Sequence, residues 1–159
     1  MNRRKGFFGA VASLSERGRA SQELGEAGEA CARSLLARHG VKDIEKIHTG
    51  WKVLFGVRDG QRVPLQAWPI EKVSGDFIGI KDGRKVLCEC KSTDSDRISF
   101  SDFRPHQISA LDRTVENQGI SLVFVFIDSL PFLLSWPIDG FGPGCSLVLK
   151  RGTLLVQSR

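Results

Sequence analysis

Apolar and polar positions along the chain alternate with two different periods, which divide it into helical and extended segments. Helical spacing occurs over residues 22–39, where Gly40 follows as a stop, and again over residues 103–118, where Gly119 follows. The apolar positions that recur at this spacing are Leu24, Cys31 and Leu35 in the first segment, and Ile108, Leu111 and Val115 in the second. Residues 1–20 lack a strong period, so we expect a flexible basic arm there and a single domain over residues 21–159.

Extended segments fill most of the remaining chain. They are expected at IEKIHTGWKVLFGV, RVPLQAWPIEKVSG (extended or irregular), DFIGI, KVLCECK, ISLVFVFI, LPFLLSW and SLVLKRGTLLVQ. The tetrapeptides RDGQ and KDGR are hairpin turn signals, whereas TDSDRISFSD is expected to be a polar loop. A helix, several strands, a second helix and further strands predict an α/β domain with a mixed central β-sheet flanked by helices.

Composition narrows the function classes only a little. The chain has 159 residues, 41% of them hydrophobic and 26% charged, which is ordinary for one globular domain with a core. The formal net charge of +5 permits a polyanionic partner. Apolar runs are too short for a membrane span, and the basic start is broken by glycine, which argues against a signal peptide. The four cysteines lack a disulfide or zinc spacing, so we expect free thiols and a cytoplasmic protein.

Candidate chemistry lies in the stretch VLCECK. Alternate side chains of a strand share a face, so Glu89 and Lys91 stand together while Cys88 and Cys90 face the other way. If the KDGR turn pairs this strand with DFIGI, Asp76 reaches the same end of the hairpin as Glu89. The sequence therefore predicts two carboxylates and an amine converging at one end of two paired strands.

Two adjacent carboxylates repel each other and need neutralisation, which a divalent cation supplies. Hard oxygen ligands favour Mg²⁺ or Mn²⁺, and the backbone carbonyl of Cys90 offers another oxygen beside Asp76 and Glu89. A metal that keeps its waters can activate one as a nucleophile, and Lys91 would orient that water or stabilise charge on a phosphate. The alternative is a surface ion pair between Glu89 and Lys91, which has little energetic value.

The motif SGDFIGI…CECK resembles the signature of PD-(D/E)xK nucleases, with Asp76, Glu89 and Lys91 in the motif positions. Gly75 stands where many members have proline. The resemblance implies a restriction-endonuclease-like core and a glutamate on the first helix in a G-E-x-x-A setting, which Glu29 matches. Glu26 is the rival. Helical geometry favours Glu29 by about two to one, because it borders the apolar side of the helix whereas Glu26 lies almost opposite.

The second helix carries a further candidate in FRPHQISAL. Members of this fold often have a glutamine here beside the lysine, which implies that Gln107 helps to position water or phosphate. His106 is expected to contact phosphate or solvent and not to act as a base. Without the family context, Gln107 is equally well explained as a solvated glutamine at a helix start.

Within the superfamily, the chain is most similar to RecU-type Holliday junction resolvases, with archaeal-type resolvases sharing the GExxA helix, the ECKS ending and the helix glutamine. The similar stretches are KIHTGWKVLFGV, AWPIEKVSGDFIGIKDGRKVLCECKST and FRPHQISAL…NQGISLVFVF. The resemblance implies a Mg²⁺-dependent homodimer that cuts four-way DNA junctions by paired symmetric nicks and leaves 5′ phosphates. RecU members carry a protruding stalk, for which residues 51–74 are short; a hairpin at RDGQR would be a smaller counterpart.

Basic residues around these motifs are candidates for phosphate contacts, although each alone is more often a solvated charge. They are Arg3, Arg4, Lys5, Arg58, Arg62, Lys81, Arg84, Arg97 and Arg104, together with His106. Two other functions stay open at this point. One is a restriction- or repair-type nuclease acting on duplex or flapped DNA, and the other is a basic DNA-binding module whose acids are structural.

Overall fold

The computed structural model describes residues 5–48, 51–58, 61–69 and 75–158, and for residues 5–17, 21, 51–58 and 62–69 it gives the backbone alone. The elements run in chain order as α1 (Lys5–Arg38), β1 (Lys42–Lys46), β2 (Trp51–Arg58), β3 (Gln61–Pro69), β4 (Phe77–Lys81), β5 (Arg84–Thr93), β6 (Arg97–Ser99), a 3₁₀ turn η1 (Phe100–Asp102), α2 (Pro105–Glu116), β7 (Ile120–Ile127), β8 (Leu130–Ser135), β9 (Cys145–Lys150) and β10 (Thr153–Ser158).

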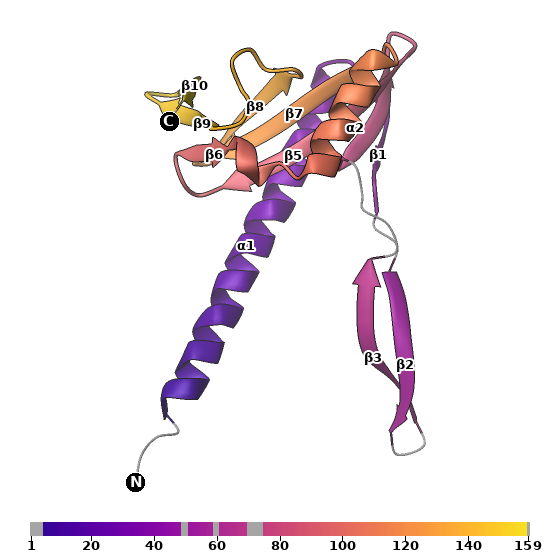
Figure 1. Cartoon of the computed structure of the whole chain (residues 1–159), viewed down its shortest axis with the longest axis vertical. Helices are drawn as coiled ribbons and strands as arrows, with labels where there is room; N and C mark the ends of the chain where they lie inside the picture. The colour runs from indigo at the N-terminus through magenta and orange to yellow at the C-terminus, as the bar shows by residue number, and fades with distance from the viewer. Residues whose placement is uncertain (1–4, 49–50, 59–60, 70–74, 159) are drawn as a thin grey trace.

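The central sheet has the strand order β1-β4-β5-β7-β8. Strands β5 and β7 run parallel, and the other neighbouring pairs are antiparallel, so the sheet is mixed as the sequence predicts. The crossover between the two parallel strands includes α2, which lies on one face of the sheet, while the C-terminal half of α1 lies on the other (Figure 1). The prediction of an α/β fold with a mixed sheet between helices is confirmed.

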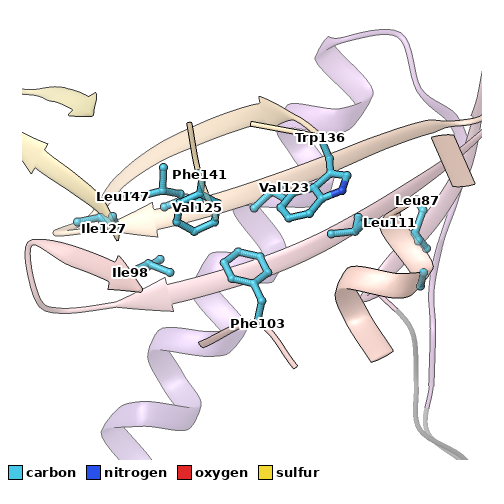
Figure 2. Close-up of a cluster of buried hydrophobic side chains, with 11 residues drawn as sticks. Leu87, Ile98, Phe103, Leu111, Val123, Val125, Ile127, Trp136, Phe141 and Leu147 are labelled. Atoms are coloured by element: carbon cyan, nitrogen blue, oxygen red, sulfur yellow. The ribbon is translucent and has the colours of Figure 1, made fainter. Parts of the chain in front are cut away.

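Strand alternation divides the core into two layers. Val123, Val125 and Ile127 of β7 point toward α2 and the C-terminal strands, where they pack with Phe103 and Trp136 (Figure 2). On the opposite face, Leu122 and Phe124 of the same strand pack against α1. The α1 side chains in that layer include Ala32 and Leu36, both almost fully buried. Because both faces are covered, β7 is apolar at nearly every position, as buried sheet strands are.

Two smaller sheets complete the fold. Strands β10, β9 and β6 form one of them, and β2 and β3 form an antiparallel hairpin. This hairpin protrudes from the central sheet on the same side as the N-terminal half of α1 (Figure 1). It occupies the chain position at which the sequence suggests a reduced stalk. The predicted pairing of the last two strands, β9 with β10, is also present.

Three local predictions are wrong. The first helix begins at Lys5 and not at residue 22, because the glycines that precede residue 22 lower helix propensity by about 1 kcal/mol each without breaking a helix as proline does. The expected polar loop contains β6, whose partner β9 is remote in sequence. In α2, Val115 is 39% exposed, while Ala110, Leu111 and Thr114 are the buried positions. Residues 1–4 lie outside the described residues, and the division into an arm and a domain stays a prediction.

Candidate active site

The β4–β5 hairpin positions the first carboxylate. Asp82 and Gly83 both have positive φ angles, of 51° and 73°, which is the geometry of a type I′ turn. This turn fixes a register in which Phe77 faces Cys88. One residue further on, the Asp76 backbone amide donates a 2.9 Å hydrogen bond to the Cys88 carbonyl. Asp76 therefore stands beside Glu89 at the end of the hairpin, as the sequence predicts.

Asp76 is held in place by the backbone of β5. Its Oδ2 atom accepts a 2.7 Å hydrogen bond from the Cys90 amide. Burial raises the pKa of Asp76 above its usual value, although the Cys90 hydrogen bond and the charge of Lys91 act in the opposite direction. Glu29 is among the charges that raise this pKa, so the helix glutamate lies within electrostatic range of Asp76. The result is a carboxylate that the sheet holds in place and whose burial outweighs the charges of its lysine neighbours.

Glu89 lies deeper than Asp76, with only 2% of its side chain exposed. Its Oε1 atom forms an ion pair with Lys91 Nζ at 2.9 Å and accepts a hydrogen bond from Gln107 Nε2. Its Oε2 atom is buried and lacks a hydrogen-bond partner among the described residues. Burial, followed by the negative charge of Asp76, raises the pKa of Glu89 to about 7. One oxygen of this carboxylate is thus hydrogen-bonded, while the other can still accept a hydrogen bond or bind a cation.

Gln107 connects the lysine with the glutamate. Pro105 occupies the first turn of α2, where its missing amide is tolerated, and Gln107 follows on the side facing the sheet. Its Oε1 atom accepts hydrogen bonds from Lys91 Nζ at 3.0 Å and from the Arg104 amide at 2.9 Å, while its Nε2 atom donates to Glu89. The ammonium of Lys91 also lies 5.0 Å from the centre of the Phe103 ring. These contacts restrict Lys91 to one position beside Glu89.

The α1 side of the site is built differently. Gly28 allows a close approach, because a Cβ atom there would lie 2.1 Å from Ser92 Oγ at the end of β5. The next residue, Glu29, forms an ion pair with Lys46 of β1. Lys46 is opposite Phe77 in the β1–β4 register and is therefore next to Asp76. The hydrogen bond that Lys46 donates to Glu29 is the largest cause of a raised pKa for Lys46. Glu26, by contrast, is exposed and accepts a hydrogen bond from Gln22.

Sequence reasoning missed Lys46. The signal was present, since it is a charged residue inside the extended segment IEKIH, as Glu89 is inside VLCECK. Its neighbours were not predictable in the same way, because the β1–β4 pairing joins segments that are more than thirty residues apart in the chain. We therefore add Lys46 to the site residues proposed from the sequence.

Comparison with known protein families identifies the family to which the chain belongs. The family model for recombination protein U (RecU) matches residues 32–137, about two-thirds of the chain. The chain belongs to the RecU family. This is a family of Holliday junction resolvases of the PD-(D/E)xK-like type, which are nucleases that act on DNA. Asp76, Glu89, Lys91 and Gln107 lie inside the RecU match, whereas Glu29 precedes it. A search of curated proteins finds no match.

The described residues of this RecU-family chain contain no group of three His, Cys, Asp or Glu side chains arranged to hold a metal ion. Glu29 is paired with Lys46 and does not complete a three-carboxylate cluster with Asp76 and Glu89. The donor set that remains consists of two carboxylates and the Cys90 carbonyl, all hard oxygens that suit Mg²⁺ or Mn²⁺. The partnerless Glu89 Oε2 fits such an ion. Glu29 as a ligand stays a prediction.

The cysteine side chains are separate from this oxygen donor set. Cys88 and Cys90 pack in the core layer between the sheet and α1. A hydrogen bond with Cys88, together with burial, raises the pKa of the Cys90 thiol far above its usual value. The thiol of Cys90 therefore stays neutral, and the residue has its backbone carbonyl alone to offer a hard cation.

The predicted DNA-contacting residues divide into near and distant groups. Arg104 and His106 lie at the start of α2, and the charge of Arg104 is among those that lower the pKa of Glu89. Lys81 and Arg84 flank the turn at the opposite end of the hairpin. The guanidinium of Arg84 donates to the Gln118 and Gly119 carbonyls, where it anchors the start of β7.

Of the remaining basic candidates, the structure describes only some side chains. Arg97 begins β6 with an exposed side chain. Arg3 and Arg4 lie outside the described residues, as do the side chains of Lys5, Arg58 and Arg62. Among the described helices, none is long and apolar enough to cross a membrane.

Proposed function

We propose that this chain is a Mg²⁺- or Mn²⁺-dependent endonuclease that resolves four-way DNA junctions by paired symmetric nicks, acting as a homodimer. Family membership supports the junction resolvase activity, and the convergence of Asp76, Glu89 and Lys91 supports their role as the cleavage site. A two-fold symmetric protein suits a junction with two equivalent strands, because each active site then acts on one of them.

The observation that carries this proposal is the burial of Glu89 with one of its carboxylate oxygens unpaired among the described residues. A buried carboxylate with one unpaired oxygen and a second acid beside it is unfavourable in the absence of a cation. If Glu89 served only as the partner of Lys91 in a structural ion pair, Asp76 would have no role beside it. Lys91 and Gln107 already satisfy Glu89 Oε1. We infer that Asp76, Glu89 Oε2 and the Cys90 carbonyl are the ligands for the cation.

Each side chain then has a defined task. When bound, the divalent cation supplies Lewis acidity and neutralises charge on the phosphate. Lys91 Nζ has three hydrogen atoms to donate, and its contacts to Glu89 and Gln107 leave it fixed beside the ligands, where it holds the attacking water or a phosphate oxygen. Gln107 fixes Lys91 through its carbonyl oxygen and Glu89 through its amide. In-line attack would leave a 5′ phosphate.

Contacts with the junction extend beyond these residues. Arg104 and His106 stand at the start of α2, next to the carboxylates, where they would contact DNA phosphates. The β2–β3 hairpin protrudes beside the site, in the chain position of a stalk, and we propose that it enters the junction (Figure 1). Basic residues predicted in this hairpin, Arg58 and Arg62, would strengthen that contact.

The test is cleavage of a mobile four-way junction with labels on all four strands. We expect nicks that depend on Mg²⁺ and map to symmetric positions on two opposing strands. Linear duplex and flapped DNA of the same sequence serve as controls. Equal cleavage of these controls would indicate a restriction- or repair-type nuclease, and binding without cleavage at any Mg²⁺ or Mn²⁺ concentration would indicate a non-catalytic DNA-binding module.

A further inference from the structure

A polar groove of about 420 Å³ begins at Lys91 and leads away from the carboxylates. It lies between the end of β5 and the segment formed by β6 and η1. Hydroxyl side chains from Thr93, Ser95 and Ser99 line it, together with Arg97. Neither the family match nor the roles assigned above give this groove a function.

The groove wall is ordered by its own hydrogen bonds. Ser95 Oγ lies 3.0 Å from Thr93 Oγ1 and donates to the Arg97 carbonyl at 3.0 Å, while the Ser95 amide donates to Thr93 Oγ1 at 3.1 Å. The carboxylate of Asp102, which also lines the groove, accepts a 2.8 Å hydrogen bond from the Ser99 amide. The one acid of the wall is thus engaged by the backbone, which reduces its repulsion of an anion.

Beyond Lys91, the positive charge along the groove comes from Arg97. Its side chain is 54% exposed, and its Nε atom lies 3.7 Å from Oδ1 of Asp96, whose side chain is 67% exposed. An exposed ion pair of this length has little energetic value, so the guanidinium can bind another anion at small cost. Arginine presents a planar set of donors that matches the oxygens of a phosphate. With Lys91 at one end and Arg97 along the wall, the groove offers cationic donors to a phosphate backbone.

We propose that this groove binds a phosphate adjacent to the scissile phosphate on the cut DNA strand, with Arg97 as its charged anchor. The inference rests on the proposed function, because it takes Lys91 to mark the scissile phosphate. A contact to a phosphate carries no direct sequence information, so the groove contributes affinity and register without sequence preference. It thereby sets which linkage of the strand reaches Asp76 and Glu89.

The first experiment measures the salt dependence of binding. Arg97→Gln is compared with the wild type by fluorescence anisotropy of a labelled four-way junction, without divalent metal, over a series of salt concentrations. Loss of one phosphate contact should lower the slope of log affinity against log salt by about 0.9. Arg97→Lys should keep the slope, since the charge is retained. Arg38→Gln is the matched control, because Arg38 is an exposed arginine at the far end of α1.

The second experiment locates the contact. A neutral methylphosphonate replaces one phosphate at a time near the crossover, and binding is measured for each junction. In the wild type, a linkage next to the cut should show weakened binding, and Arg97→Gln should lose the penalty at that linkage while keeping the others. If Arg97→Gln keeps both the wild-type salt slope and the wild-type methylphosphonate profile, the proposal that this groove binds a phosphate is wrong. Because binding is measured without metal, a chain that loses one linkage penalty in Arg97→Gln but never cuts would overturn the nuclease proposal. It would leave the phosphate contact of Arg97 and remove its placement beside a scissile phosphate.

Discussion

The two halves of the site differ in how their acids are neutralised. On the sheet, Glu89 is almost fully buried, shares one oxygen between Lys91 and Gln107, and leaves the other without a partner. On α1, Glu29 is 28% exposed and already forms an ion pair with Lys46. We infer that the buried half takes up a divalent cation at Glu89 Oε2, whereas Glu29 in the outer half is already paired with a lysine. This difference suggests that the sheet residues form the metal site and that Glu29 joins it only if Lys46 moves away.

The cause lies in the elements that supply each side chain. Strands β4 and β5 hold Asp76 and Glu89 by backbone hydrogen bonds in one register, so their proximity is imposed by the fold. Glu29 comes from α1, which packs on one face of the sheet, and its side chain forms an ion pair with Lys46. Acids fixed by a sheet are forced into repulsion that a metal can relieve, while an acid with rotamer freedom avoids it.

The largest predicted effect is on cleavage by Lys91→Ala. Loss of the ammonium should slow junction cleavage by about 10²–10³-fold, the range for a positioned charge-stabilising donor, while junction binding changes little. Single-turnover cleavage and anisotropy measure the two quantities. Lys85→Ala, an exposed lysine on the same strand at its opposite end, is the control and should cleave as the wild type does. Full cleavage by Lys91→Ala would show that Lys91 does not take part in cleavage and would overturn its assigned role.

Next in size is the effect of pH on the stability of the metal-free chain. Because the folded pKa of Glu89 is raised to about 7, the folded state binds more protons than the unfolded state between pH 4.5 and 7. The free energy of unfolding should therefore fall as pH rises through this window, by up to about 3 kcal/mol, and then level off. Asp76 adds to the fall in the same direction.

Urea unfolding at several pH values, with and without Mg²⁺, measures this dependence. Glu89→Gln should flatten the curve, since its side chain cannot ionise. Mg²⁺ should restore stability mainly above pH 7, where the carboxylate is ionised and free to bind it. Equal stabilisation by Mg²⁺ in Glu89→Gln would argue against Glu89 as a ligand.

Gln107→Ala should have a smaller effect, because this side chain acts through Lys91 and Glu89. Residues that orient metal ligands typically contribute 10–100-fold to activity or metal affinity, and we expect a loss of about this size. Cleavage as a function of Mg²⁺ concentration separates the two contributions. His106→Ala, from the neighbouring position on α2, should instead weaken DNA binding. A Gln107→Ala enzyme with wild-type rate and wild-type Mg²⁺ dependence would restrict Gln107 to capping α2 through the Arg104 amide.

The sequence predicted the proximity of the sheet residues but not the surroundings of Glu29. Asp76, Glu89 and Lys91 followed from a tight turn and from strand alternation, both of which act over a few residues. The environment of Glu29 depends on β1 lying beside β4, a contact that local patterns do not encode. The same reason explains β6, which is a strand because β9 pairs with it. The long α1 was missed because propensity alone marks helix ends weakly in the absence of proline.

The smallest predicted effect concerns the ion pair of the outer half. In Lys46→Gln, Glu29 loses its cation and is released toward Asp76, so Mg²⁺ affinity should rise by a few-fold, in the range of an exposed ion pair of about 1 kcal/mol. Isothermal calorimetry of Mg²⁺ binding measures this change, and Lys42→Gln, an exposed lysine on the same strand, is the control.

The double variant Lys46→Gln with Glu29→Gln decides how the gain arises. If Glu29 becomes a ligand, the double variant should return to wild-type Mg²⁺ affinity, because the released carboxylate is then absent. If the gain persists in the double variant, the positive charge of Lys46 near Asp76 opposes the cation directly, and Glu29 contributes no ligand. In that case the sheet residues alone would hold the metal, and Glu29 and Lys46 would form only an ion pair beside it.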